Sequence, residues 1–381
     1  MRFREIVRFE AGERLRQPFT WFSVALVFAL GVLRADAADL GITLYHAPLN
    51  AAASMLMVGI MATLVTAALF VDAAQRDARW RMEPLFHTAP LRGRDYLGGR
   101  FAGSLAVNAL LLLLVPAGLL AGAGLAGTRP EELGAFRPAA YAFPLLVLLL
   151  PNLVVNGAAL FGVALLTRRS LPGYLAALAL TVAYQFTLVV GQRRGGALWA
   201  LLDPTGAVAM ARQADGWTRV EQNTSLLRLE GLLLWNRLLW LALAAGMLAL
   251  ALRRFRRMRA VPAGGARAPE REEARPAAVP RERAVPRAPR EFRARTHLLQ
   301  VGETARTGLL HIVAAREFGL IAILLFAFAL ISVADRWIFG GMLFWPLTQS
   351  VAAGLTRQGL PEIVAVLTVF YAGELVWRER D

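Results

Sequence analysis

The sequence predicts an all-α integral membrane protein, and three observations carry this prediction. The composition is 57% hydrophobic with a mean hydropathy of +0.48, whereas soluble domains run nearer 45–50% apolar. Several uncharged stretches exceed the ~20 residues that a helix needs to cross a bilayer. Arginine-rich segments alternate with arginine-poor ones, so about three quarters of the 42 cations fall on one side of the predicted membrane. We therefore expect a multi-pass protein whose N-terminus lies in the cytoplasm.

The composition excludes several kinds of chemistry. All 42 cationic residues are arginine, and cysteine is absent. The chain therefore cannot form a disulfide or a Cys-ligated zinc site, a Walker A loop or a lysine Schiff base. The four histidines are scattered and form no HExxH pair, and no Ser/His or His/Asp constellation indicates an intramembrane enzyme. We expect neither a metal site nor enzymatic activity.

The net charge of +15 is typical at first sight of a nucleic-acid-binding protein. Its distribution argues against that interpretation, because the arginines cluster at the predicted inner ends of the spans. Anionic lipid headgroups are the partners that this placement favours. We expect membrane lipids as partners and no nucleic acid.

Residues 1–258 are expected to form one unit of six spans. The segment 1–17 is charged with apolar residues interspersed, which favours a helix in the cytoplasmic interface, before Pro18 turns the chain into the first span. A cleaved signal peptide is the alternative, because Ala35-Asp36-Ala37 resembles a cleavage site, but the leading segment is long and carries three glutamates. Between the last two spans, Gly195–Leu202 predicts a short surface helix, and Asp203-Pro204-Thr205 predicts a turn. The predicted spans are Phe19–Leu33, Ala51–Val71, Phe101–Gly127, Pro138–Thr167, Ser170–Gly191 and Glu230–Leu252.

The segment 72–100, between the second and third spans, is the most informative part of the chain. It holds six arginines and four acidic residues, with large apolar side chains among them. Asp72–Met82 lacks Gly and Pro and is expected to form a short helix that Pro84 ends, and a second helix is expected to start near Arg94. We expect a folded hairpin on the cytoplasmic side. A solvated, positively charged loop is the plain alternative, whereas the apolar content favours a docking element for a soluble partner.

The chain changes character after the sixth span and then begins a similar pattern again. Residues 259–296 consist almost entirely of Ala, Pro, Arg, Glu and Gly, which predicts a disordered cytoplasmic linker, with binding to anionic lipid as the alternative. His311–Glu317 precedes the apolar run Phe318–Ala334 as Ile6–Glu13 precedes the first span. Residues 297–381 are therefore expected to be the start of a second unit, with a further span near Leu360–Leu375. Trp337–Thr356 is an alternative membrane segment.

Four polar residues lie in or near the apolar spans and are candidates for function. Hydrogen bonds between spans are the alternative explanation for such residues. Glu374 is expected at the interface rather than as a proton carrier, and no series of buried carboxylates indicates ion-coupled transport. The four residues are Asn108, Asn152, Asn156 and Glu374.

Several motifs resemble those of ABC-2 type exporter permeases. Arg14-Leu-Arg-Gln-Pro18-Phe-Thr-Trp21 resembles the elbow and first helix of that family. The segment 75–101 resembles the intracellular hairpin of that family, whose coupling helices seat on the ATPase subunit. The matching motifs are Gln75-Arg76-Asp77 through Met82-Glu-Pro84-Leu85, then Thr88-Ala-Pro90 and Tyr96-Leu-Gly-Gly-Arg-Phe101. Two further segments, Leu229–Arg237 and Ala372–Asp381, resemble a bacterial subgroup of this family. In that subgroup two permease units are joined in tandem and are often followed by a zinc aminopeptidase-like domain. This chain departs from the subgroup by ending after Asp381, which predicts a truncated second unit without its own hairpin or peptidase.

The resemblance implies the fold of a six-helix ABC-2 type transmembrane domain, and the membrane-spanning permease subunit of an ATP-binding cassette exporter in the bacterial inner membrane. A separate ATPase subunit would bind ATP and Mg²⁺, and this chain would hold no cofactor. Further partners would be a second copy in a homodimer or another permease unit. A non-transporting membrane anchor or scaffold, for a partner such as a peptidase, is the alternative. The residues expected to contact the ATPase are Arg76, Asp77, Arg79, Met82, Leu85 and Phe86.

Overall fold

The protein is a bundle of long helices. The computed structural model describes residues 2–36, 43–79, 82, 92–125, 129–194, 196–260, 294–314, 316–337, 364 and 368, and no β-strand occurs among them. Five helical segments are long and apolar enough to cross a membrane, and two bent helix pairs raise this number to seven if each pair is one span. The prediction of an all-α membrane protein is confirmed at this level.

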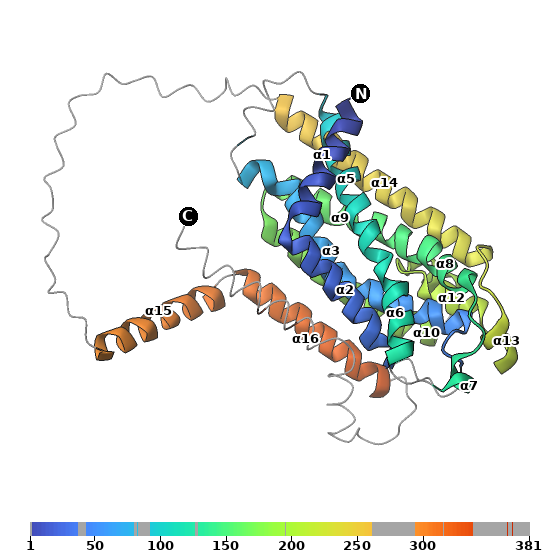
Figure 1. Cartoon of the computed structure of the whole chain (residues 1–381). Helices are drawn as coiled ribbons and strands as arrows, with labels where there is room; N and C mark the ends of the chain where they lie inside the picture. The colour runs from blue at the N-terminus through green and yellow to red at the C-terminus, as the bar shows by residue number, and fades with distance from the viewer. Residues whose placement is uncertain are drawn as a thin grey trace, which may run out of the picture.

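The N-terminal part consists of two bent or broken segments with one long helix between them. Helix α1 (Arg2–Arg16) bends by 74° into α2 (Pro18–Asp36), and Pro18 suits this position because the first turn of a helix needs no N–H donor. Helix α3 (Pro48–Arg79) is continuous. Helices α5 (Gly93–Leu112) and α6 (Leu114–Leu125) follow one another. Figure 1 shows α1 and α2 alongside α5 and α6, with α1 against α5 and α2 against α6.

The expected short helix over residues 72–82 does not begin at Asp72. Residues 72–79 are the last two turns of α3, because no Gly or Pro interrupts the helix after Gly59. The second expected helix is confirmed, since α5 begins at Gly93.

The next part of the chain begins with a broken span. Helix α7 (Pro130–Leu133) precedes α8 (Pro138–Pro144), a π-helix η1 (Leu145–Leu149) and α9 (Leu150–Thr167). Pro151 has no N–H to donate to residue 147, which accounts for the irregular stretch.

Helices α10 (Ser170–Arg194) and α14 (Gly231–Ala260) are the next two long helices. Between them lie α11 (Ala197–Leu202), α12 (Ala207–Gln213) and α13 (Arg219–Thr224). The surface helix and the turn predicted for residues 195–205 are thus present.

Side-chain contacts fix the directions of the long helices, which alternate along the chain. The segments α1–α2, α5–α6 and α10 run one way, and α3, α9 and α14 run the other way. The contacts that show this are Ile6 with Gly99, Gly31 with Gly118, Gly59 with Leu149, Gln75 with Ala164, Val71 with Gly173, Phe70 with Phe101, and Ala251 with Gly162. Arginine-rich segments therefore meet at one end of the bundle. We call it the charged end (α1, residues 72–79, 92–100, 168–169 and 253–254), and we call the opposite end the loop end (residues 43–47, 129–137 and 196–230).

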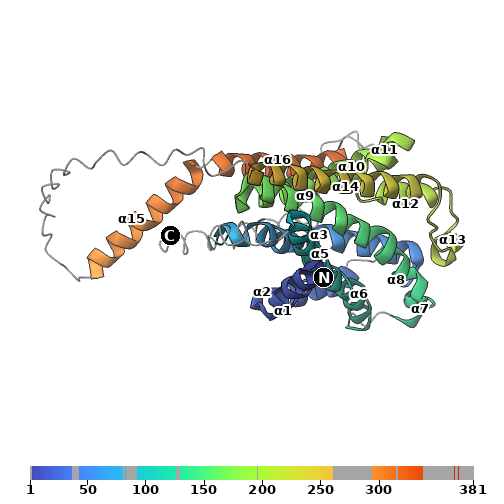
Figure 2. The same cartoon turned by 90° about the horizontal axis from the view of Figure 1, so that it is seen from above.

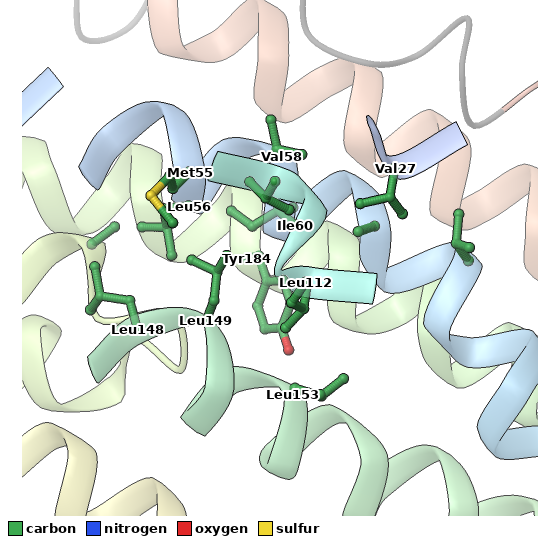
Figure 3. Packing of buried hydrophobic residues seen from close by; sticks show 14 of the residues in the cluster. Val27, Met55, Leu56, Val58, Ile60, Leu112, Leu148, Leu149, Leu153 and Tyr184 are labelled. Carbon is green, nitrogen blue, oxygen red and sulfur yellow. The ribbon is translucent and has the colours of Figure 1, made fainter. Parts of the chain in front are cut away.

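Helix α3 occupies the centre of the bundle and α14 its edge. In α3, 72% of the most apolar window is buried, against 11% in α14. Figure 3 shows Leu56 and Ile60 of α3 packed near Leu149 of η1 and Tyr184 of α10. The edge position leaves most of the apolar side chains of α14 for lipid, which is the arrangement that a membrane protein requires.

Two further helices follow the predicted linker. Helix α15 (Ala294–Ala314) and helix α16 (Arg316–Trp337) meet at a bend of 68°. Helix α16 packs against α10, where Leu178 and Val182 contact Ile321 and Phe328, and Figure 2 shows α16 beside α10. The ends of the predicted disordered linker 259–296 are helical, because residues 259–260 belong to α14 and residues 294–296 to α15. Residues 261–293, Glu374 and the expected last span apart from Val364 and Thr368 lie outside the described residues.

Candidate functional site

The first candidate site is a group of five charged residues at the charged end, which we call the root cluster: Glu10, Arg14, Asp72, Arg76 and Arg100. Glu10 is its centre, with Arg14 Nε at 2.9 Å, an Arg76 guanidinium nitrogen at 3.4 Å and Arg100 Nε at 3.7 Å. Asp72 pairs with Arg76 at 2.9 Å and with Arg14 at 3.4 Å. The cluster therefore links α1, the end of α3 and the start of α5.

The root cluster is largely withdrawn from solvent. Glu10 is 2% exposed and Arg14 is fully buried, while Arg76 remains 15% exposed. Buried charges cost several kcal/mol each unless they are paired and hydrogen-bonded. The five side chains thus stabilise one another, and removing Glu10 leaves the buried arginines around it with less compensation.

Glycines on α5 allow α1 to approach closely enough to form the root cluster. A Cβ atom on Gly103 would lie 2.7 Å from Glu10 Cβ, and one on Gly99 would lie 2.8 Å from Ile6 Cγ2. Tyr96 adds a further contact on α5, because its hydroxyl accepts a hydrogen bond of 3.0 Å from Arg100. Small residues at this crossing therefore decide where the buried charges meet.

The predicted ATPase-contacting residues are divided by the structure. Arg76 points into the root cluster rather than outward. Met82 is 42% exposed, and the backbone of Asp77 and Arg79 forms the last turn of α3. The side chains of Asp77 and Arg79, and all of Leu85 and Phe86, lie outside the described residues. Contact with an ATPase stays a prediction for all six.

Sequence reasoning did not single out Glu10, Arg14 or Arg100. The available signal was the four-residue spacing of Glu10 and Arg14 on one helix face, repeated by Asp72 and Arg76. Such pairs are common on solvated helices, so the spacing alone does not reveal burial.

The second candidate site is a polar seam in the centre of the bundle. Asn156 of α9 donates a hydrogen bond to Thr63 Oγ1 of α3 at 3.2 Å and accepts one from the hydroxyl of Tyr184 of α10. Asn156 is 4% exposed and Thr63 is 1% exposed. These bonds join three helices, so the interhelical explanation for Asn156 is supported by its contacts.

The seam continues to the loop end through Arg237, which is 4% exposed. Arg237 donates to Asn152 Oδ1 at 2.7 Å, to the carbonyl oxygen of Pro204 at 3.0 Å and to the side chain of Asn236. Asn236 in turn donates to the carbonyl oxygens of Ala200 and Asp203. The side chains of α14 thereby hold the loop between α11 and α12 against the bundle.

A small cavity borders the seam, with a water-accessible volume of about 20 Å³, which is enough for roughly one water molecule. Its polar wall consists of uncharged side chains from α3, α9, α10 and the loop after α11. They are Thr63, Thr66, Asn152, Asn156, Tyr184 and Thr205. Asn108 lies elsewhere, fully buried, and donates within its own helix to the carbonyl oxygen of Ser104.

The two sites differ in the chemistry of their side chains. The root cluster has carboxylates that are paired with arginines, and the seam has amides, hydroxyls and the guanidinium group of Arg237. Among the described residues, no group of three or more His, Asp or Glu side chains could hold a metal ion.

A scan against models of protein families, a search of curated proteins and a search of solved structures each found no match.

Proposed function

We propose that this chain is the membrane-spanning permease subunit of an ATP-binding cassette exporter, built on an ABC-2 type transmembrane domain. It would work in the bacterial inner membrane with a separate ATPase subunit that binds ATP and Mg²⁺. The ATPase would dock at the charged end, against the segment 77–91, which runs from the last turn of α3 toward the start of α5. The sequence motifs of this segment and of the first helix motivate the proposal.

One structural observation carries the proposal: arginines on both sides of the segment 77–91 are tied to the same carboxylate. Arg76 of α3 and Arg100 of α5 both reach Glu10 of α1. A force on the segment would therefore reach three helices together instead of bending one loop. Movement of packed helices as a unit is how domain motions are transmitted through proteins.

We assign the charged end to the cytoplasm. It gathers arginines from α1, from the start of α5, from the turn between α9 and α10 and from the end of α14, including Arg94, Arg169 and Arg253. Loops that carry more arginine stay on the cytoplasmic side of a membrane. This orientation gives a soluble ATPase access to the segment 77–91.

The test is co-purification of the chain from its native membrane in a mild detergent. The proposal expects an ATPase subunit with a Walker A loop in stoichiometric amount. Two variants then locate the docking site: Arg79→Glu within the segment 77–91, and Arg169→Glu as the matched control in the turn between α9 and α10. Arg76 is unsuitable for charge reversal, because its side chain belongs to the root cluster.

We expect Arg79→Glu to reduce the amount of bound ATPase about tenfold, which corresponds to 1.4 kcal/mol of binding free energy. We expect Arg169→Glu to cause no loss. Met82→Glu, at an exposed neighbouring position, should act like Arg79→Glu. A chain that purifies without any ATPase would overturn the proposal. An ATPase that binds but drives no flux would instead favour the non-transporting anchor or scaffold.

A further inference from the structure

Helix α15 carries an apolar face. Apart from its end next to α16, no other described part of the chain covers this face. Leu298, Val301 and Leu309 are 73%, 66% and 62% exposed. Their spacing places them on one side of the helix, and Gln300 and Thr307 lie on the opposite side. Figures 1 and 2 show α15 projecting away from the bundle.

The angle between α15 and α16 limits how α15 can lie when α16 crosses a membrane. Helix α16 is apolar from Phe318 to Ala334 and exposes Leu320, Ile323 and Phe326 on the side that does not contact α10. The bend of 68° between the two helices means that α15 lies far from parallel to α16. If α16 crosses the bilayer along its normal, the axis of α15 lies closer to the membrane plane than to the normal.

Helices α1 and α15 precede similar bends but are covered in different ways. Helix α1 packs along α5 and buries Glu10 and Arg14 there. The described side chains of α15 include no buried residue. The described part of the chain therefore covers α1 but leaves the apolar face of α15 uncovered.

We propose that α15 binds the bilayer interface, with Leu298, Val301 and Leu309 in the boundary between headgroups and acyl chains. Its polar face argues against crossing the membrane, because Gln300, Glu303 and Thr307 would then enter hydrocarbon. Such a helix, with one apolar and one polar face, lies in the interface instead.

The charges of α15 indicate that apolar burial, and not attraction to anionic lipid, holds the helix in place. Arg306 and Glu303 approach to 3.6 Å, and both are 70% exposed. Arg295 then remains as the single additional described cation of this helix. Zwitterionic bilayers should therefore suffice for binding.

The absence of cysteine from the chain permits a direct test with single labels on the full-length protein in zwitterionic proteoliposomes. The environment-sensitive fluorophore NBD is attached to Leu298→Cys and Leu309→Cys on the apolar face. Gln300→Cys and Thr307→Cys, each two residues away on the polar face, are the matched controls. Emission is measured with aqueous iodide and with lipids that carry a nitroxide near the headgroup or near the chain end.

We expect labels at positions 298 and 309 to emit at shorter wavelength than labels at positions 300 and 307. The nitroxide near the headgroup should quench the labels at 298 and 309 about twofold more than those at 300 and 307. Aqueous iodide should quench the labels at 300 and 307. Labels that are all quenched by chain-end nitroxide would overturn the proposal in favour of a spanning helix. Four labels quenched by iodide would overturn it in favour of a helix in water. Labels at 298 and 309 that are shielded from both quenchers would show that a second copy or another protein covers the face.

Discussion

The substitution Glu10→Gln tests whether the root cluster holds the charged end together. The change preserves the size of the side chain but removes its charge, and three arginines lie within 3.7 Å of that carboxylate. Removing one member of a buried ion pair typically costs 3–5 kcal/mol. Asp72 remains beside Arg14 and Arg76, so we expect a loss at the lower limit, about 3 kcal/mol, or somewhat more than a hundredfold in the unfolding equilibrium.

The assay is unfolding of the purified chain in mixed micelles with increasing denaturing detergent, followed by the fluorescence of its 9 tryptophans. Glu5→Gln is the matched control, because Glu5 lies on the same helix and is exposed. The double variant Glu10→Gln/Arg100→Gln should cost less than the sum of the two single changes, since the two residues interact. Equal stability of Glu10→Gln and Glu5→Gln would refute the reasoning, because the buried charge would then contribute nothing.

Two other predictions concern the α2–α6 crossing and the loop end. Gly118→Leu should destabilise the bundle by about 1–3 kcal/mol in the same assay, because the new Cβ would overlap the backbone carbonyl oxygen of Phe28. Gly124→Leu is the control and should change the stability little, because the space around Gly124 is open. Equal losses of stability in the two variants would contradict the close crossing of α2 and α6. His46 Nδ1 lies 2.8 Å from the hydroxyl of Tyr141, and partial burial lowers the pKa of His46 in the folded protein. As the pH falls through about 6.5, the histidine of the unfolded chain therefore takes up a proton before that of the folded protein does. The free energy of unfolding should therefore decrease from pH 7.5 to 5.5, and this slope should be reduced in His46→Phe; an unchanged slope in the variant would assign it to other groups.

Much of the helical framework could be predicted from the sequence. Apolar runs of membrane length located α2, α3, α9, α10 and α14 to within a few residues at most ends, because the bilayer requires long helices with internally bonded backbones. The extension of α3 through residue 79 was predicted less well. Charged residues mark the edge of the hydrocarbon region but do not end a helix, and no helix-breaking residue follows Gly59 before that point.

The candidate sites depended on contacts between distant parts of the chain. Asn156 was a sequence candidate because it is polar inside an apolar run, but its partners Thr63 and Tyr184 come from two other helices. Glu10 gave no such signal, because a glutamate in a charged N-terminal segment is usually solvated. Its burial follows from the glycine-mediated approach of α1 to α5.

The sequence by itself determined the helical, membrane-like class of the protein, the approximate limits of most of its membrane-length helices, and the gathering of arginine at alternate turns. These features depend on composition and on local periodicity, which each segment carries within itself. Only the tertiary structure decided that Glu10, Arg76 and Arg100 share one buried cluster, and that α15 lacks the covering that α1 has. Both facts depend on which helix faces pack together, and packing is set by side-chain shapes across the bundle rather than by the spacing of residues along one helix.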